Sequence, residues 1–326
     1  MLIIKRHSTD PYFNLATEEY VLKNFADDSF MLWRNEPSVI VGKHQNTLAE
    51  VNLDYVNANQ IKVVRRLSGG GAVFHDLGNI NFTFIRKGDH HTLVDFRKFT
   101  GPILEVMQKL GIEARFEGRN DLTIDGCKFS GNAEHVFKDR VLHHGTLLFS
   151  AMMNDLSGVL NVDHSKFSDK AVKSVRSRVT NISGHLKEPM DIEDFMELVC
   201  NHVKEKYPEA LTIELSDTDH HHIEQLVKEK YSTWDWNFGY SPEYNFKKQL
   251  KTNGGHIEMN LHVKNGFITE AKIFGDYIKK PDTCEIETAL KGLPHTGSAI
   301  RAKLSTIEIS DFFTNVSLDE LISIFF

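Results

Sequence analysis

A run of three glycines at residues 69–71 constrains the fold of this 326-residue chain more than any other feature of its sequence. Glycine has no Cβ, so such a run can adopt positive φ angles and let the backbone approach a ligand closely. Consecutive N–H groups in a loop of this kind form a nest that binds anions. Arg65 and Arg66 stand directly before the run. These features predict a phosphate cradle, and a glycine-rich turn that binds no ligand is the alternative.

An alternating strand follows the glycine run. Polar and apolar residues alternate from Asn79 to Phe84, which predicts a strand with one polar and one buried face. The loop lacks the Gly-Lys-Ser/Thr of a Walker A motif, and its glycines are contiguous rather than spaced as in a Rossmann fingerprint. The sequence therefore predicts a nucleotide or acyl-phosphate site outside these two common motifs.

Composition places the chain among ordinary globular proteins, with 40% hydrophobic and 25% charged residues. Its apolar runs are far shorter than the ~20 residues of a membrane span, and its N-terminus lacks the order of a signal peptide. Three widely spaced cysteines imply no disulfide framework, so we expect a cytoplasmic protein with no membrane association. A net charge of −7 argues against a general nucleic-acid binder.

The charge is unevenly distributed along the chain. Residues 170–178, named here the basic segment, contain four basic residues and no acidic one. A basic segment on an acidic protein indicates an anionic ligand or an acidic partner surface. A solvated loop with no ligand is the alternative.

Strands and helices are mixed without a regular βαβ alternation, which indicates an α+β fold. The length favours two domains. The aromatic-rich stretch 234–244 precedes a restart of the strand pattern, and Asn265-Gly266 predicts a hairpin within it. We expect one domain over residues 1–244 and a small α+β domain over residues 245–326.

A second polar block surrounds Lys128. Asp125-Gly126 predicts a hairpin turn, after which strict alternation would place Lys128, Ser130 and Asn132 on one strand face. Cys127, Phe129 and Ala133 would then occupy the opposite face, where Cys127 serves packing. A lysine on an interior strand needs an anionic partner, which a substrate would supply. An exposed edge-strand lysine is the alternative.

Histidine runs do not predict a metal site in this sequence. His143 and His144 are adjacent on an expected strand, so their side chains point to opposite faces and cannot easily share one ion. The run at residues 220–222 is typical of a solvated helix start. No zinc-ligand spacing occurs elsewhere in the chain.

Residues 65–79 closely resemble the signature of the bacterial lipoate–protein ligase A family. Five further blocks also resemble the family, at residues 119–121, 128–133, 143–148, 174–181 and 234–244. The resemblance covers essentially the whole chain. It implies a biotin/lipoate-ligase-like catalytic domain related to class II aminoacyl-tRNA synthetase cores, with a C-terminal accessory domain. It also implies an ATP-dependent ligase that forms lipoyl-AMP and then transfers the lipoyl group to a lysine.

The resemblance implies roles for particular residues. Lys128 would be catalytic, as a cation that polarises the acyl carbonyl and stabilises the oxyanion. ATP or lipoyl-adenylate would be bound by Arg66, Ser68, Gly70, Gly71, Ala72, Val73, Phe74, Asn79, Asp121, Lys128, Ala133 and His144. The basic segment corresponds to the adenylate-binding loop of the family, with contacts from Lys173, Arg176 and Arg178. Leu67, Val73 and Val39 are candidates for lining an apolar tunnel for the lipoyl tail.

The implied substrates are lipoate and ATP with Mg²⁺, the metal being held through the phosphates with Asp121 as a candidate contact. No tightly bound prosthetic group is implied. The implied partners are lipoyl domains of 2-oxoacid dehydrogenase E2 subunits and the glycine-cleavage H protein, with the chain itself a monomer. Nucleic acid and membranes are not expected partners.

Two rival functions differ from this hypothesis in testable ways. An ATP-independent octanoyl- or lipoyl-transferase would need a nucleophilic cysteine beside Lys128, and Cys127 is the only nearby candidate. Cys200 and Cys284 fall in expected helices remote from the motifs. A non-catalytic module that merely holds lipoate is the second rival. Lipoate-dependent ATP–pyrophosphate exchange separates the ligase from both.

Overall fold

The computed structural model describes residues 1–88, 94–152, 158–160, 164–174, 178–252, 255–275, 283–313 and 315–326. They form two compact units, each of which combines strands with helices. The first unit contains Met1–Lys43, Asp54–Leu160 and Ser174–Thr233, and the second contains His44–Leu53, Asn161–Lys173 and Trp234–Phe326. The mixed strand pairing confirms the α+β class.

The eight-stranded sheet of the first unit has the order β12-β1-β2-β6-β10-β9-β8-β7. Its strands are β1 (Leu2–Ile4), β2 (Ser29–Arg34), β6 (Asn79–Lys87), β7 (Ala114–Glu117), β8 (Asp121–Ile124), β9 (Cys127–Phe137), β10 (Arg140–Leu148) and β12 (Leu211–Ile213). The pairings β12–β1 and β1–β2 are parallel, and the remaining ones are antiparallel.

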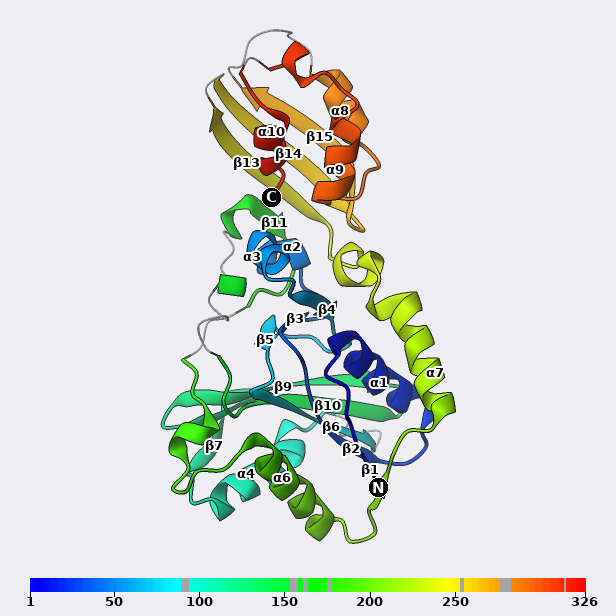
Figure 1. The fold of residues 1–326 in the computed structure, drawn as a ribbon, viewed down its shortest axis with the longest axis vertical. Coiled ribbons are helices and arrows are strands. Elements are labelled where there is room, and N and C mark those ends of the chain that lie inside the picture. The colour runs from blue at the N-terminus through cyan, green and yellow to red at the C-terminus, as the bar shows by residue number, and fades with distance from the viewer. Residues whose placement is uncertain are drawn as a thin grey trace. The chain divides into compact units, whose positions relative to one another are not determined.

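Helices cover both faces of this sheet (Figure 1). One face carries α4 (Phe96–Lys109) and α6 (Ile192–Lys206), with a core of buried aromatic and aliphatic side chains between them and the sheet. The other face carries α1 (Pro11–Asn24) and a small sheet of order β4-β3-β5. The small sheet consists of β3 (Ser38–Val41), β4 (Lys62–Arg65) and β5 (Val73–His75).

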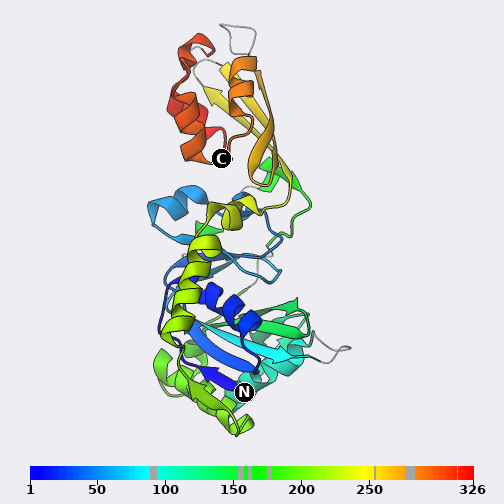
Figure 2. The ribbon, with the colours of Figure 1, turned by 90° about the vertical axis from the view of Figure 1, so that its right-hand side faces the viewer.

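Two further helical segments pack beside α1 in the first unit. They are α7 (Asp217–Leu226) and the short π-helical turn η3 (Val227–Tyr231), and both views show them alongside α1 (Figures 1 and 2). The described residues of this unit also contain α3 (Leu53–Ala58) and η2 (Ile182–His185). Asp10 caps α1 by accepting a hydrogen bond from the Phe13 amide, with Pro11 at the first helical position, where it needs no donor.

The second unit is built on an antiparallel sheet of order β11-β13-β14-β15 with its own apolar core. The strands are β11 (Phe167–Asp169), β13 (Tyr244–Thr252), β14 (Gly255–Lys264) and β15 (Phe267–Gly275). The helices are α2 (Thr47–Glu50), η1 (His164–Lys166), η4 (Asp235–Gly239), α8 (Cys284–Leu290), α9 (Gly297–Leu304), η5 (Ile309–Asp311) and α10 (Leu318–Ser323).

This division differs from the boundary expected after residue 244. β11 pairs with β13, so a segment near residue 167 adds a strand to the C-terminal sheet. Residues 44–53 also belong to that unit. Neither segment carries a local sequence signal for such long-range pairing.

Both expected hairpin turns are confirmed. Asp125 and Gly126 have φ of 50° and 72° between β8 and β9, and Asn265 and Gly266 have φ of 51° and 76° between β14 and β15. Positive φ at both central residues is the requirement that selects Asn-Gly and Asp-Gly. None of the helices in the described ranges is long and apolar enough to cross a membrane.

Candidate active site

The glycine loop lies between β4 and β5 and is tied together by Arg66. The Arg66 guanidinium donates to the carbonyls of Gly69 at 2.6 Å, Gly71 at 2.8 Å and Ile40 at 3.1 Å. Gly70 has a φ of 93°, which favours glycine. A Cβ on Gly42 would lie 2.1 Å from the Gly70 carbonyl oxygen, so the two backbones are in close contact. The loop is therefore held rigidly by its own arginine.

Burial changes the chemistry of this arginine. It lowers the pKa of Arg66 to about 10, and the charge of Glu18 acts in the opposite direction. Arg65 is also fully buried and donates to the carbonyls of Gly42 and Lys43. Both arginines thus donate to backbone carbonyls of the loop region, a use that their position in the sequence does not reveal.

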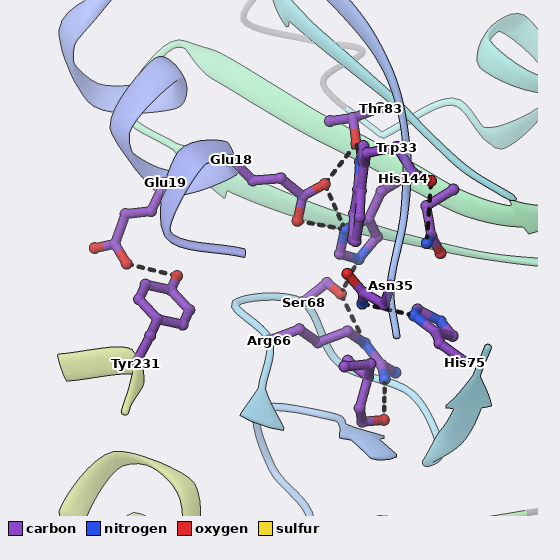
Figure 3. Close-up of polar contacts among 12 residues, drawn as sticks. Glu18, Glu19, Trp33, Asn35, Arg66, Ser68, His75, Thr83, His144 and Tyr231 are labelled. Atoms are coloured by element: carbon purple, nitrogen blue, oxygen red, sulfur yellow. Dashed lines mark hydrogen bonds and ion pairs between the residues drawn. The ribbon is translucent and has the colours of Figure 1, made fainter. Parts of the chain in front are cut away.

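A buried hydrogen-bonded chain runs from the loop into the large sheet (Figure 3). Ser68 Oγ accepts from Arg66 Nε at 3.1 Å and lies 2.6 Å from His144 Nε2. Because Ser68 Oγ accepts from the arginine, its own hydrogen is available for His144 Nε2. His144 Nδ1 then donates to the Glu18 carboxylate, 3.0 Å from each oxygen. The Glu18 carboxylate thus fixes a proton on Nδ1 of His144.

Thr83 also holds Glu18, and Trp33 in turn holds Thr83. Thr83 Oγ1 donates to Glu18 Oε1 at 2.6 Å and accepts from the indole Nε1 of Trp33 at 2.9 Å. Glu18 lies on the inward face of α1 and is only 3% exposed. Sequence analysis missed it, because a single glutamate in an amphipathic helix resembles any surface residue. The one available signal is its position among the apolar residues of that helix.

His75 is a second functional candidate that the sequence did not single out. Asn35 Nδ2 lies 3.1 Å from His75 Nδ1, and Asn35 Oδ1 accepts from Asn14 Nδ2. This orientation makes Asn35 the donor, so the His75 proton resides on Nε2. Burial, with the charges of Arg66 and His144, lowers the pKa of His75 to about 3 and keeps the ring neutral.

Lys128 lies on β9 with its side chain over Gly131. A Cβ at Gly131 would lie 2.8 Å from Lys128 Cε and 2.9 Å from Nζ. The ammonium pairs with Asp121 on β8 at 2.8 Å. We expected an anionic partner for this half-buried lysine, and the protein itself supplies one. The partner is Asp121, which was predicted to belong to the same site.

The prediction that Lys128 shares one strand face with Ser130 and Asn132 is wrong. The pairing of β8 with β9 shifts register between Leu122 and Thr123, so Thr123 opposes Lys128 and Leu122 opposes Ser130. The extra residue of this β-bulge breaks the alternation. Ser130 and Asn132 therefore both lie on the face opposite to Lys128, where Asn132 donates to Ser130 Oγ and its Oδ1 contacts His143 Nε2 at 3.2 Å.

The basic segment is attached to the glycine loop and to Lys128. Ala72 N–H donates to Ser174 Oγ at 2.9 Å. Lys128 N–H donates to the Arg178 carbonyl at 2.8 Å, and Thr180 N–H donates to the Lys128 carbonyl at 3.0 Å. Three motifs that are separated by many residues in the sequence thus meet at one place in the first unit.

The other predicted residues fall in and around this region. Val73 and Phe74 lie on β5 directly after the loop, and Ala133 pairs with His144 across β9 and β10. Asn79 is fully buried on β6, and its Oδ1 has no partner among the described residues. Val39 pairs with Phe74 in the small sheet, and Leu67 is buried in the loop.

The structure tests the predicted contacts of the basic segment only in part. Lys173 is exposed and belongs to the second unit, and Arg176 lies outside the described residues. Arg178 is exposed, although its backbone is anchored at Lys128. In the described part of the chain, no group of three His, Cys, Asp or Glu residues is arranged to hold a metal ion.

The cysteines do not provide an obvious nucleophile. Burial raises the pKa of Cys200 on α6 to about 11, which disfavours its thiolate. Cys284 lies on α8 in the second unit, so both residues occupy helices as expected. Cys127 opposes Ile124, a core residue, at the start of β9.

Comparisons with known proteins cover nearly the whole chain. A model described as the lipoyl protein ligase A/B catalytic domain matches residues 10–204, and one described as the bacterial lipoate protein ligase C-terminus matches residues 241–325. Lipoate–protein ligase 1 of Staphylococcus aureus is 42% identical over 98% of both chains. The lipoate-protein ligase LplJ of Bacillus subtilis is 40% identical over the full length of both chains.

Solved structures agree with these matches. P. falciparum LipL1 in complex with lipoate covers 99% of this chain and 98% of its own, at 26% identity and a TM-score of 0.63. Lipoate-protein ligase A bound with ATP has the same identity and TM-score, over 73% of this chain and 98% of its own. A bi-partite lipoate protein ligase from Thermoplasma acidophilum, described with its E2 lipoyl domain, is 26% identical over 73% of this chain and 96% of its own, with a TM-score of 0.64.

Proposed function

The chain belongs to the lipoate–protein ligase family, and from that premise we propose which of its residues carry the reaction. Its activity is the ATP-dependent ligation of lipoate to protein. In the first step the lipoate carboxylate attacks the α-phosphate of ATP and forms lipoyl-AMP with release of pyrophosphate. In the second step a lysine amine of the acceptor attacks the acyl carbonyl and releases AMP.

The observation that carries the assignment is the meeting of three motifs around Lys128. Its backbone pairs with residues 178–180, its ammonium pairs with Asp121, and Ser174 of the basic segment bonds the glycine loop. A fixed cation, a glycine cradle and a basic segment are the groups that an acyl-adenylate requires, because its chemistry depends on positioning and on neutralising charge.

In this proposal Lys128 is the catalytic residue. Its ammonium contacts the acyl phosphate, polarises the carbonyl and stabilises the oxyanion that develops in both steps. Asp121 holds the ammonium at 2.8 Å and so keeps the lysine extended over Gly131 before substrate binds. The apolar side chains of Val39, Leu67 and Val73 are proposed to line the path of the lipoyl tail.

The nucleotide is proposed to bind along the glycine loop. Gly70, Gly71 and Ala72 present backbone groups, with Val73 and Phe74 directly after them. The role proposed for Arg66 is twofold, since its bonds to loop carbonyls fix the cradle and its charge favours an anion beside it. The chain Ser68–His144–Glu18 supports the same wall, with Ala133 opposite His144 and with Asn79 further along β6.

Mg²⁺ is proposed to enter with ATP. In phosphate-transferring sites this ion is usually held by one or two carboxylates and the substrate phosphates. Asp121 offers a carboxylate next to Lys128, so it fits that role. Lys173, Arg176 and Arg178 are proposed to contact the adenylate from the basic segment.

Several finer assignments rest on the family alone. We propose lipoyl domains of 2-oxoacid dehydrogenase E2 subunits and the glycine-cleavage H protein as acceptors, and a monomeric enzyme in the cytoplasm. The Thermoplasma ligase described with its E2 lipoyl domain supports the first acceptor. The proposed relationship to biotin–protein ligases and class II aminoacyl-tRNA synthetase cores is supported by the antiparallel centre of the large sheet. Residues 1–244 and 245–326 are proposed as the catalytic and accessory domains, and the family models at 10–204 and 241–325 support that order.

The direct test uses the purified chain with lipoate and MgATP. Lipoate-dependent ATP–pyrophosphate exchange is expected without any acceptor, followed by a lipoyl mass increase when an apo lipoyl domain is added. An ATP-independent transferase would show no exchange and would acylate the domain only from an acylated donor. A binding module would show neither reaction.

A further inference from the structure

A buried carboxyl–imidazole pair lies beneath the candidate active site, on the sheet face that α4 covers. Glu134 on β9 and His143 on β10 are directly opposite in the antiparallel pairing, and His143 Nδ1 lies 2.9 Å from Glu134 Oε1. Their side chains are 3% and 0% exposed. The rings of Phe82, Phe96 and Phe99 surround the imidazole.

The hydrogen bonds around His143 determine where its protons lie. Asn132 Nδ2 donates to the Asn120 carbonyl at 3.0 Å and to Ser130 Oγ at 3.2 Å, so Asn132 Oδ1 is the atom that faces His143 Nε2. An amide oxygen only accepts, and therefore His143 Nε2 carries a proton. The contact between Nδ1 and Glu134 then needs one more proton, which either partner can supply.

The surroundings place this second proton on the carboxyl group. Burial raises the pKa of Glu134 to about 7, the charge of Asp95 raises it further, and the Asp95 backbone amide acts in the opposite direction. Burial, followed by the charge of His144, holds the pKa of His143 well below its usual value. Asp95, the N-cap of α4, and His144 from β10 are the charged or titratable groups that act on the pair, while β6 contributes the ring of Phe82. The pair is thus a neutral acid donating to a neutral imidazole.

A continuous chain of contacts leads from this pair to Lys128. His143 holds Asn132, and Asn132 is bonded to Asn120 through both its amide N–H and its side chain. Asn120 Nδ2 donates back to the Asn132 carbonyl at 2.5 Å. The next residue is Asp121, whose carboxylate holds the Lys128 ammonium.

We infer that Glu134 and His143 are positioning residues for the reaction, because they fix the turn of residues 118–120, which places Asp121 and through it Lys128. The inference rests on the catalytic role proposed for Lys128. It predicts a specific pH dependence. When Glu134 loses its proton, the neutral imidazole has one N–H for two acceptors, the Glu134 carboxylate at Nδ1 and Asn132 Oδ1 at Nε2, so one of the two hydrogen bonds that hold Asn132 to the pair is lost.

The sign of that dependence follows from the raised pKa. At pH values below the pKa of Glu134, its proton is present and the turn is held. As the pH rises through that pKa, the support for Lys128 weakens. Adenylation is the half-reaction to measure, because it does not involve the titrating amine of an acceptor lysine.

The experiment compares the wild-type chain, Glu134→Gln, Glu134→Ala and Glu105→Gln in lipoate-dependent ATP–pyrophosphate exchange from pH 6 to 9. Glutamine at 134 can donate an N–H to His143 Nδ1 and does not titrate, so exchange should persist at alkaline pH. Alanine removes the donor and should lower kcat by roughly ten- to hundredfold at pH 7, with a much smaller change in the KM for ATP. Glu105 forms the matched control, since it pairs with His202 at 2.7 Å on the surface helices α4 and α6.

The expected result is an alkaline decline in the wild type and in Glu105→Gln that Glu134→Gln abolishes. Identical pH profiles for the wild type and Glu134→Gln would overturn the inference, as would full activity of a folded Glu134→Ala. If the alanine variant does not fold, the profile of the glutamine variant alone decides. Lys128→Met separates this inference from the proposed function: undiminished exchange in that variant refutes the role of Lys128, whatever the Glu134 variants do.

Discussion

Replacing Gly131 by alanine should disable the enzyme without unfolding it. The Lys128 side chain passes directly over this glycine, and an added Cβ would lie 2.8 Å from Lys128 Cε and 2.9 Å from Nζ. Ordinary van der Waals contacts begin near 3.4 Å. The end of the lysine must therefore move by roughly 0.5–1 Å, away from its position beside Asp121.

The size of the effect follows from this displacement. A misplacement of about 1 Å at a reacting group costs on the order of 100-fold in rate. We expect kcat for lipoate-dependent ATP–pyrophosphate exchange to fall by roughly ten- to hundredfold, or about 1.4–2.8 kcal/mol of transition-state stabilisation. Only the flexible end of a side chain is displaced, and alanine in a strand loses less chain entropy than glycine. The unfolding temperature should therefore stay the same or rise.

Gly101→Ala on α4 is the matched control, because open space surrounds the position where its Cβ would lie. That variant should exchange at the wild-type rate. A folded Gly131→Ala enzyme with wild-type kcat would refute the reasoning, since it would show that the reaction does not depend on where Lys128 is held.

Two further predictions concern stability. Gly145→Ala should lower the free energy of unfolding in urea by about 3 kcal/mol, because its Cβ would lie 2.1 Å from Asn132 Oδ1 and 2.6 Å from Phe82 Cε1 inside the core; unchanged stability would contradict this packing. His75 has a folded-state pKa lowered to about 3, so its contribution is present above its unfolded pKa near 6.5 and is lost as the pH falls. The free energy of unfolding of the wild type should decrease on acidification below pH 6.5, and His75→Asn should make that slope shallower by up to about 1.4 kcal/mol per pH unit; an equal slope in both would refute the assignment of His75 as buried and neutral.

Local chemistry made much of the site predictable from the sequence. Asp125-Gly126 and Asn265-Gly266 demanded turns with positive φ, and the structure has them. The three consecutive glycines predicted a loop of unusual backbone conformation, which Gly70 confirms. In each case a residue type has a conformational preference strong enough to act without tertiary contacts.

The unpredicted features depend on pairing over long distances in the chain. The register shift at Lys128 arises from the pairing of β9 with β8, and no residue of β9 predicts it. Glu18 and Ser174 reach the site from α1 and from the basic segment, and only the tertiary fold shows their partners His144 and Ala72. Strand alternation alone therefore placed Asn132 on the wrong face.

The contacts of Arg65 and Arg66 also could not be predicted from the sequence. The resemblance implied that Arg66 binds ATP or lipoyl-adenylate, and it assigned no role to Arg65. The structure shows both side chains donating to backbone carbonyls around the loop. Whether a buried guanidinium holds the protein or a ligand depends on which carbonyls the fold leaves nearby, and that information is not local.

The central claim is that Lys128 is the fixed cation of an acyl-adenylate site, and Lys128→Met tests it most directly. Methionine keeps an unbranched side chain over Gly131 but removes the charge. The measurement is the rate of lipoate-dependent ATP–pyrophosphate exchange, together with lipoyl transfer from preformed lipoyl-AMP to an apo lipoyl domain. We predict that both rates fall by at least roughly 100-fold in a folded variant. Wild-type rates in both half-reactions would contradict the account.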